Sequence, residues 1–333
     1  MTRDTAVHIL LSESTDPYFN LALEEWLLRD SHHSFVVLIY RNRPSIILGR
    51  NQNPWLECDL DFSATNDITV ARRISGGGAV YHDPGNTNFT FIMPRPLYEP
   101  TKYLGYASRA LIPFGIRARI TKRHNLFVGQ AKVSGTAFML TGKRALQHGT
   151  LLIDADLGHI GNALTPANPK VETHAVASVP SPVRNLTEIA PSLTHDNFAK
   201  SLIAVLAEEF ETTYENISAD NFDDAPRLHA YLDKQHDWEW IYGRTPAFNF
   251  EIPDSHSNGQ PIRLTVRKGR IFEVEAPDDS PAAQELRKHI GSKYSPGYLR
   301  RNCLLRTLST RAVEYGAHPV GTDSRPTGAD DVP

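Results

Sequence analysis

Short runs of hydrophobic residues, separated by polar and turn-forming residues, dominate the first half of the chain. Runs of about four to eight apolar or alternating residues between Gly, Pro, Asn and Asp are typical of β-strands. The pattern therefore predicts a succession of short strands. They are expected at Val7–Leu11, Phe35–Tyr40, Ser45–Leu48, Ile68–Arg72, Asn88–Met93, Leu126–Val128 and Leu146–Ile153.

Two segments have helical spacing instead. Asp16 followed by Pro17 supplies an N-cap and a first-turn proline for a helix that we expect to end near Arg29. A second helix is predicted over Asp196–Thr213, where apolar residues recur three and four positions apart. Strands and helices are thus mixed without a strict βαβ repeat. This mixture predicts an α+β fold.

Glycine and proline mark a joint between two domains at Tyr242–Pro246, directly after a cluster of aromatic residues. We therefore expect a large domain over residues 6–243 and a small α+β domain over residues 246–315. Residues 316–333, rich in Gly, Pro, Asp and Ser, are expected to form a disordered tail. In the small domain, the pattern predicts strands at Phe248–Ile252, Ile262–Val266 and Arg270–Val274 and a helix at Pro281–Ile290.

Composition and charge exclude several classes of protein. The 333 residues are 40% hydrophobic and 22% charged, as in a globular chain with a sizeable core. The formal net charge of −3 gives no global attraction to nucleic acid or to an anionic membrane, so neither is an expected partner. No apolar run approaches the roughly 20 residues of a membrane-spanning helix, and the N-terminus has no secretory-signal pattern.

The two cysteines, Cys58 and Cys303, lie far apart and outside any CxxC or Cys/His metal spacing. This arrangement predicts neither a disulfide framework nor a metal site, and it fits a reducing compartment. The first six residues contain one Arg and one Asp, which is not the Arg-rich, acid-poor pattern of a mitochondrial presequence.

The most distinctive local pattern is RRISGGGAVYHD at residues 72–83, in which two arginines precede three glycines. Glycines allow backbone N–H groups to approach an anion closely, and neighbouring arginines can add charge-assisted hydrogen bonds. The segment is a candidate phosphate-binding loop, although it has neither the P-loop pattern GxxxxGK[ST] nor the dinucleotide pattern GxGxxG. From the residues alone, the alternative is a flexible surface turn beside an ordinary ion pair.

Two further segments carry candidate functional side chains. Lys132, in AKVSGTA at residues 131–137, lies between a short apolar strand and small residues. There an ammonium group can point into a cleft and offset charge on a carbonyl or phosphate oxygen. His148 and Thr150, in QHGTLL at residues 147–152, begin an apolar strand. Taken singly, a loop lysine is usually a solvated surface group, and a histidine in this setting is usually structural.

Together, RRxSGGGAVYHDxGNxNFTF, KVSGTA and HGTLL, in this order and at these separations, resemble the lipoate-protein ligase and lipoyltransferase family. The similarity covers about residues 11–306. NQNPW at residues 51–55 and WEWIYG at residues 238–243 most closely resemble the animal-type mitochondrial lipoyltransferases. The resemblance implies a mixed-sheet catalytic domain related to the biotin/lipoate protein ligases over residues 6–243, with the small domain as an accessory.

The family's motifs imply roles for individual residues. Lys132, the lysine of KVSG, is the implied catalytic residue and is expected to contact the lipoyl carbonyl and the phosphate. Asn125 stands where bacterial ligases resembling this chain carry an acidic residue, which bears on magnesium-dependent activation. Strands around residues 89–91 are candidate walls for the apolar lipoyl tail. The implied lipoyl-AMP site consists of Arg73, Ser75, Gly76, Gly77, Gly78, Ala79, Tyr81, Arg123, Lys132 and Thr150.

By this resemblance the chain transfers a lipoyl group from lipoyl-AMP, or another activated donor, to a lysine of another protein. The implied acceptors are the lipoyl domains of 2-oxoacid dehydrogenase E2 subunits and the glycine-cleavage H protein. We expect a monomer with no tightly bound cofactor or metal, located in mitochondria or otherwise in the cytoplasm. Three alternatives stay open: a complete ligase that uses ATP and magnesium, a thioester transferase working through Cys58, and a non-catalytic acyl-adenylate sensor.

Overall fold

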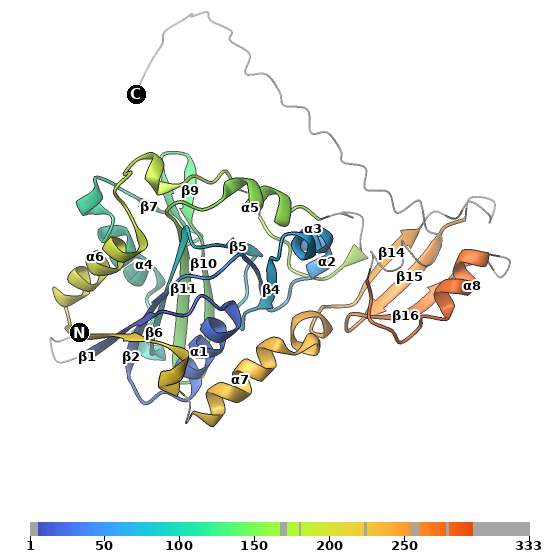
Figure 1. Ribbon diagram of the computed structural model, residues 1–333, viewed down its shortest axis with the longest axis horizontal. Coiled ribbons are helices and arrows are strands. Elements are labelled where there is room, and N and C mark those ends of the chain that lie inside the picture. The colour runs from blue at the N-terminus through green and yellow to red at the C-terminus, as the bar shows by residue number, and fades with distance from the viewer. Residues whose placement is uncertain are drawn as a thin grey trace, which may run out of the picture.

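The computed structural model describes residues 6–166, 172–179, 181–222, 225–252, 254, 260–277 and 280–295. The expected tail at residues 316–333 and Cys303 lie outside the described residues. Figure 1 shows a large N-terminal body of sheets and helices with a smaller sheet beside it. Within the described residues, no helix has both the length and the apolar character needed to cross a membrane.

A six-stranded mixed sheet forms the centre of the large body. It consists, in spatial order, of β10 (Thr136–Leu140), β11 (Arg144–Leu152), β6 (Asn86–Pro94), β2 (Phe35–Tyr40), β1 (Ala6–Ser12) and β13 (Glu211–Ile217). β1 is parallel to β2 and β13, and the other neighbours are antiparallel. All six side chains of β2 are buried, which explains why this strand is continuously apolar.

Helices cover both faces of the main sheet (Figure 1). One face carries α1 (Pro17–Arg29) and α7 (Pro226–His236), and the other carries α4 (Pro100–Arg109) and α6 (His195–Ala207). Successive strand residues point to opposite faces of a sheet. Accordingly, Phe35 and Val37 of β2 join the core beneath α4 and α6. Val36 and Leu38 join the core beneath α1.

Two three-stranded sheets flank the main sheet and carry the sequence motifs. One contains β4 (Thr69–Arg72), β3 (Ser45–Leu48) and β5 (Val80–His82), and the glycine-rich segment connects β4 to β5. The other contains β7 (Arg119–Ile120), β8 (Leu126–Val128) and β9 (Ala131–Ser134), and β9 carries Lys132. The remaining helical segments of the large body are α2 (Pro54–Glu57), α3 (Leu60–Thr65), α5 (Leu157–Ala163), η1 (Arg95–Leu97), η2 (Ile112–Phe114), η3 (Leu186–Glu188) and η4 (Ala219–Phe222).

Three strands of a small antiparallel sheet follow the π-helical turn η5 (Glu239–Gly243), and its fourth strand comes earlier in the chain. The sheet contains β12 (Glu172–Thr173), β14 (Phe248–Ile252), β15 (Ile262–Arg267) and β16 (Arg270–Glu275), and α8 (Pro281–Arg287) packs beside it. Trp55 of the large body packs into its core against Phe248 and Tyr294. The predicted α+β fold with a mixed sheet and a small C-terminal sheet is thus confirmed. The domain limits, residues 6–243 and 246–315, stay a prediction.

The helix expected over Asp196–Thr213 ends earlier than its pattern suggested. α6 ends at Ala207, and Thr213 lies in β13, which pairs with β1 at the edge of the main sheet. Most side chains of β13 are exposed, so this strand lacks the apolar alternation that would have identified it. The pattern likewise did not predict α4 and α7.

Candidate active site

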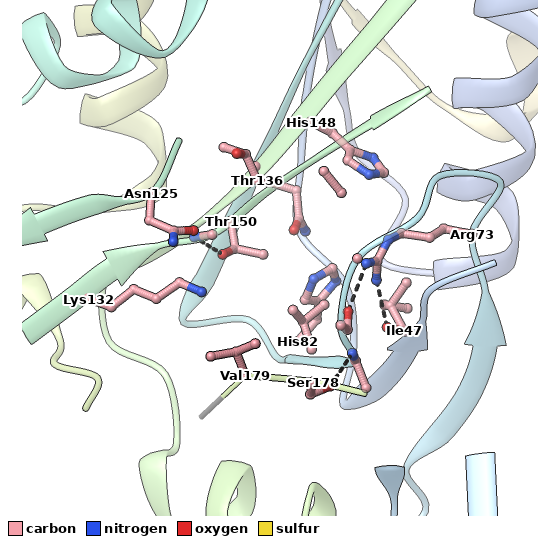
Figure 2. Close-up of a pocket in the computed structure, with 18 of the residues that line it drawn as sticks. Ile47, Arg73, His82, Asn125, Lys132, Thr136, His148, Thr150, Ser178 and Val179 are labelled. Atoms are coloured by element: carbon pink, nitrogen blue, oxygen red, sulfur yellow. Dashed lines mark hydrogen bonds between the residues drawn. The ribbon is translucent and has the colours of Figure 1, made fainter. Parts of the chain in front are cut away.

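A pocket of about 350 Å³ lies where the main sheet meets the two three-stranded sheets. Figure 2 shows Lys132 and Asn125 on one side of this pocket and Arg73 and His148 on the other. Ser75, Gly76 and Tyr81 do not line it. Of the residues implied for lipoyl-AMP, the wall contains Arg73, Gly77, Gly78, Ala79, Arg123, Lys132 and Thr150.

The glycine loop, residues 75–78 between β4 and β5, is held in place by the Arg73 guanidinium. Nη2 of Arg73 donates to the carbonyl oxygens of Gly76 and Gly78, both at 2.7 Å. Nε donates to Ser75 Oγ at 3.0 Å. The sequence pattern suggested the Arg73 N–H groups as donors to an anion, but most of them bond to the glycine loop itself. Burial lowers the pKa of Arg73 to about 10, so at neutral pH a positive charge lies directly behind the loop.

Close packing and backbone conformation both require glycine in this loop. Gly77 has a φ of +86°, in the left-handed region that favours glycine. A Cβ on Gly49 would lie 2.1 Å from the Gly77 carbonyl oxygen. A Cβ on Gly78 would lie 2.8 Å from Ser178 Oγ. In the described part of the chain, the N–H groups of Gly76, Gly77 and Gly78 have no hydrogen-bond partner, so the loop offers backbone donors to an anion.

Lys132 extends from β9 into the pocket, toward Thr150 and the glycine loop (Figure 2). Its N–H donates to Pro182 O at 2.8 Å, which fixes the backbone. Gly135 makes room for the ammonium group, because a Cβ there would lie 2.9 Å from Lys132 Nζ. Burial lowers the pKa of Lys132, and none of the described carboxylates forms an ion pair with it. The poorly solvated ammonium group can therefore bind an anionic ligand group strongly.

Thr150 and Asn125 lie on the same side of the pocket as Lys132 (Figure 2). Thr150 Oγ1 accepts a hydrogen bond from the Gly135 N–H at 3.2 Å, which joins β11 to the end of β9. Arg123 is exposed and also lines the pocket, so it lies at the rim. The described lining residues include no Asp or Glu, and the described residues contain no cluster of His, Cys, Asp and Glu that could hold a metal ion.

Ser75 and Tyr81 support the wall from behind. The Ser75 hydroxyl lies 2.7 Å from His148 Nε2, and His148 Nδ1 lies 2.9 Å from the Glu24 carboxylate. Ser75 and Glu24 are buried, and His148 alone of the three lines the pocket. Tyr81 is buried in a separate apolar cluster with Ile46. These contacts fix the positions of the glycine loop and β5.

The pocket also has an apolar wall suited to an acyl chain. From the sequence, we expected strands around residues 89–91 to form this wall. In the structure, Asn88 of that strand lines the pocket, whereas Phe89 and Phe91 are fully buried in the main core. The apolar side chains of the wall come from other elements: Leu21, Tyr40, Ile47, Val80 and Ala137.

His82 and Asn88 add two buried polar groups to this wall. The Asn42 oxygen accepts from Asn20, so its Nδ2 donates to His82 Nδ1 at 3.0 Å and the proton of His82 lies on Nε2. Burial lowers the pKa of His82 to about 3, which keeps the ring neutral. Neither His82 Nε2 nor Asn88 Nδ2 has a hydrogen-bond partner among the described residues. The wall is therefore not uniformly apolar.

A segment that the sequence pattern did not identify covers one side of the pocket. Ser178 is its anchor: Ser178 Oγ accepts from the Ala79 N–H at 2.9 Å and from Gln52 Nε2 at 3.1 Å, and it donates to the Glu57 carboxylate. Burial raises the pKa of Glu57. These partners lie about a hundred positions away, so no local pattern marks Ser178. The residues of this segment that line the pocket are Val176, Ala177, Ser178, Val179 and Ser181.

Cys58 lies away from the pocket. It is 2% exposed and packs in the apolar cluster with Ile46, Leu48 and Ile68. Burial raises the pKa of its thiol, which keeps the thiol protonated at neutral pH. This geometry gives no support to a thioester route through Cys58.

The sequence profile of the lipoyl protein ligase A/B catalytic domain matches residues 16–207, a range that contains every described pocket residue. A lipoate-protein ligase A from Psychrobacter cryohalolentis is 36% identical over 280 residues, which are 80% of this chain and 82% of the relative.

Two solved structures are also similar. The P. falciparum LipL1 structure in complex with lipoate has a TM-score of 0.64 and 28% identity, and the match covers 87% of this chain and 91% of that chain. A bi-partite lipoate protein ligase from Thermoplasma acidophilum, described together with its E2 lipoyl domain, has a TM-score of 0.59 and 24% identity. That match covers 71% of this chain and 95% of the archaeal chain and shows a shared fold.

Proposed function

The chain belongs to the lipoyl protein ligase A/B family, whose members are enzymes that attach lipoate to proteins, and we propose that it transfers a lipoyl group from lipoyl-AMP. The enzyme forms an amide between the lipoyl carboxyl group and the side-chain amine of a lysine on another protein. The proposal specifies the donor and assigns the transfer step to the pocket described above.

The observation that carries the proposal is the position of Lys132 opposite the glycine loop in one pocket (Figure 2). The Lys132 ammonium and the N–H groups of Gly77 and Gly78 are donors for the phosphate and the acyl oxygen. The apolar wall of the pocket accommodates the hydrocarbon and dithiolane part of the lipoyl group. On this proposal, Arg73, Ala79, Arg123 and Thr150 also contact lipoyl-AMP, while Ser75, Gly76 and Tyr81 position the wall.

The chemistry needs no protein nucleophile. Lipoyl-AMP is a mixed anhydride, so its carbonyl carbon is already electrophilic and AMP is a good leaving group. The neutral lysine amine of the acceptor attacks the carbonyl, the bond to the phosphate oxygen breaks, AMP departs, and the amine proton passes to solvent. Lys132 stabilises the oxyanion of the tetrahedral intermediate, and the loop orients the phosphate.

We propose the lipoyl domains of E2 subunits and the glycine-cleavage H protein as the acceptors. The archaeal ligase with the same fold was described together with its E2 lipoyl domain, which supports this class of acceptor. The monomeric state and the mitochondrial location implied by the resemblance stay predictions, and the relative reported above is bacterial.

A complete ligase, which also makes lipoyl-AMP from lipoate and ATP, is the second candidate. The bacterial relative, 36% identical to this chain, favours it because that protein is named a ligase. The uncharged Asn125 and the lack of Asp and Glu among the described lining residues favour the transferase, because magnesium prefers carboxylate ligands.

Intact mass spectrometry of a purified E2 lipoyl domain tests both candidates. The domain is incubated with the enzyme and either lipoyl-AMP or lipoate with MgATP. Addition of one lipoyl group from lipoyl-AMP alone is the expected result for a transferase. Addition from both donors would establish a complete ligase, and addition from neither would contradict the proposed function.

A further inference from the structure

Positive charge is concentrated in one stretch of this weakly acidic chain. Residues 100–153 contain nine Lys and Arg residues and no Asp or Glu, although the net charge of the whole chain is −3. Within this stretch, Lys102 and Arg109 form ion pairs with Glu209, which lies just after α6. The charge that these pairs leave uncompensated lies mainly between residues 117 and 123.

We call Arg117, Arg119, Lys122 and Arg123 the basic strip. All four side chains are exposed, and none has an ion-pair partner among the described residues. Arg119 lies on β7, and Lys122 and Arg123 lie in the turn between β7 and β8. The turn is well defined: Thr121 N–H donates to Asn125 O at 3.0 Å, and His124 N–H donates to Thr121 O at 2.9 Å.

The basic strip leads directly to the active-site lysine. Arg119 is opposite Phe127 on β8, and Phe127 is opposite Lys132 on β9. Residues directly opposite one another in antiparallel strands share a face of the sheet. Strands are spaced by about 4.8 Å, so the Cα atom of Arg119 lies about 10 Å from that of Lys132. At the other end of the strip, Arg123 lies at the pocket rim.

We propose that the basic strip is the docking surface for an acidic face of the protein that carries the acceptor lysine. The proposal rests on the proposed function, because the acceptor must place its lysine beside Lys132. Carboxylates of the acceptor within about 10 Å of the acceptor lysine would then contact the basic strip, which would orient the acceptor and speed its association. The chain's net negative charge and the small extent of the strip fit a protein with a few carboxylates better than a nucleic acid.

The test uses the triple variant Arg117→Gln, Arg119→Gln, Lys122→Gln of the full chain, which leaves the pocket residue Arg123 intact. The matched control is Arg95→Gln, Lys143→Gln, Lys200→Gln, which removes the same charge from exposed residues outside the pocket. Arg95 also matches Arg119 in detail, since each guanidinium lies 5.7 Å from an aromatic ring centroid.

Transfer from lipoyl-AMP is measured on two acceptors at low salt: an E2 lipoyl domain with acidic residues beside its lysine, and the same domain with those carboxylates changed to amides. We expect the kcat/KM of the strip variant on the acidic domain to be about tenfold below that of wild type, through a higher KM. On the amide domain, the strip variant and wild type should have the same kcat/KM. The control variant and wild type should match on both. Rising salt should remove the wild-type advantage.

Three results would overturn the inference. In the first, the strip variant transfers to the acidic domain as well as wild type does. In the second, its kcat/KM falls by the same factor on both domains. In the third, wild type binds a fluorescent oligonucleotide at physiological salt and the strip variant does not. Failure of the proposed function is a different result, because wild type would then transfer to neither domain.

Discussion

Lys132 is a partly buried cation without an ion pair among the described residues, and this determines what its removal should do. We expect Lys132→Ala to reduce lipoyl transfer about 10²- to 10³-fold, because the oxyanion and phosphate lose a preorganised cation. The fold should persist, because the substitution removes a poorly solvated charge rather than a structural contact. Single-turnover transfer from lipoyl-AMP, with thermal unfolding measured in parallel, checks both parts.

Cys58→Ala is the matched control for the Lys132 variant, since it removes the one buried thiol of the described large body. It should retain transfer, because the adenylate route needs no thiol. Wild-type rates in Lys132→Ala would contradict the assignment of Lys132. A lipoyl adduct on Cys58 would point to the thioester route instead.

Sequence alone could propose Lys132 and the glycines as candidate site residues because their signals are local, and the structure places Lys132, Gly77 and Gly78 in one pocket. The KVSG segment and three consecutive glycines are recognisable without knowing the fold. Ser178 and Gln52 could not be identified in this way, because they are 126 positions apart and meet only in the folded chain. The partners of the Arg73 N–H donors were mispredicted for the same reason. The carbonyl oxygens that accept from them come together only in the folded loop.

At the level of elements, the contact between Gly49, which directly follows β3, and the glycine loop sets the loop's position. A Cβ on Gly49 would lie 2.1 Å from the Gly77 carbonyl oxygen, so the backbone must shift to accept it. We expect Gly49→Ala to lower the free energy of unfolding by about 1–3 kcal/mol. It should also weaken lipoyl-AMP binding, because the N–H donors of the loop move. Denaturant unfolding and calorimetric titration with lipoyl-AMP measure the two effects.

Gly105→Ala in α4 is the control for Gly49→Ala, because nothing lies within 4 Å of the added Cβ. A helix-interior alanine should raise the free energy of unfolding by about 0.5–1 kcal/mol and leave ligand binding unchanged. If Gly49→Ala behaved like this control, the close approach of Gly49 to the glycine loop would contribute neither to stability nor to ligand binding.

Strands with at least one continuously buried face were predicted best. β2, β3 and β14 have the predicted bounds, because continuous or alternating apolar runs are created by burial itself. β13 was missed since it is an exposed edge strand whose partner, β1, lies about two hundred positions earlier. Edge strands are specified by long-range pairing rather than by their own apolar pattern.

At the level of the whole molecule, Arg72 connects the candidate active site to the segment that leads into the C-terminal sheet. Its guanidinium donates to Gly49 O at 2.9 Å beside the glycine loop and to Ile241 O at 2.7 Å in η5. Trp240 Nε1 returns a hydrogen bond to Arg72 O at 2.7 Å. The turn before the small sheet therefore braces the strand that carries the glycine loop.

Acid should destabilise the molecule through two histidines, His82, which is buried, and His195, which is partly buried. Burial lowers the pKa of His82 to about 3 and that of His195 to about 4, from 6.5. The unfolded chain therefore takes up these protons first. Their contribution to stability is complete above pH 6.5 and is lost as the pH falls toward 4. Each should add a slope of about 1.4 kcal/mol per pH unit in this window.

Denaturant unfolding between pH 7 and pH 5 measures this slope, and His195→Gln separates one histidine from the rest. The variant should show a shallower pH dependence, while His174→Gln, at an exposed position, should keep the wild-type slope. The carboxylates with lowered pKa values, such as Glu24 and Glu209, lose their contribution only below about pH 4.5, outside the window. An unchanged slope in His195→Gln would mean that His195 takes up its proton without unfolding, and that its burial beside Thr87 does not resist charge.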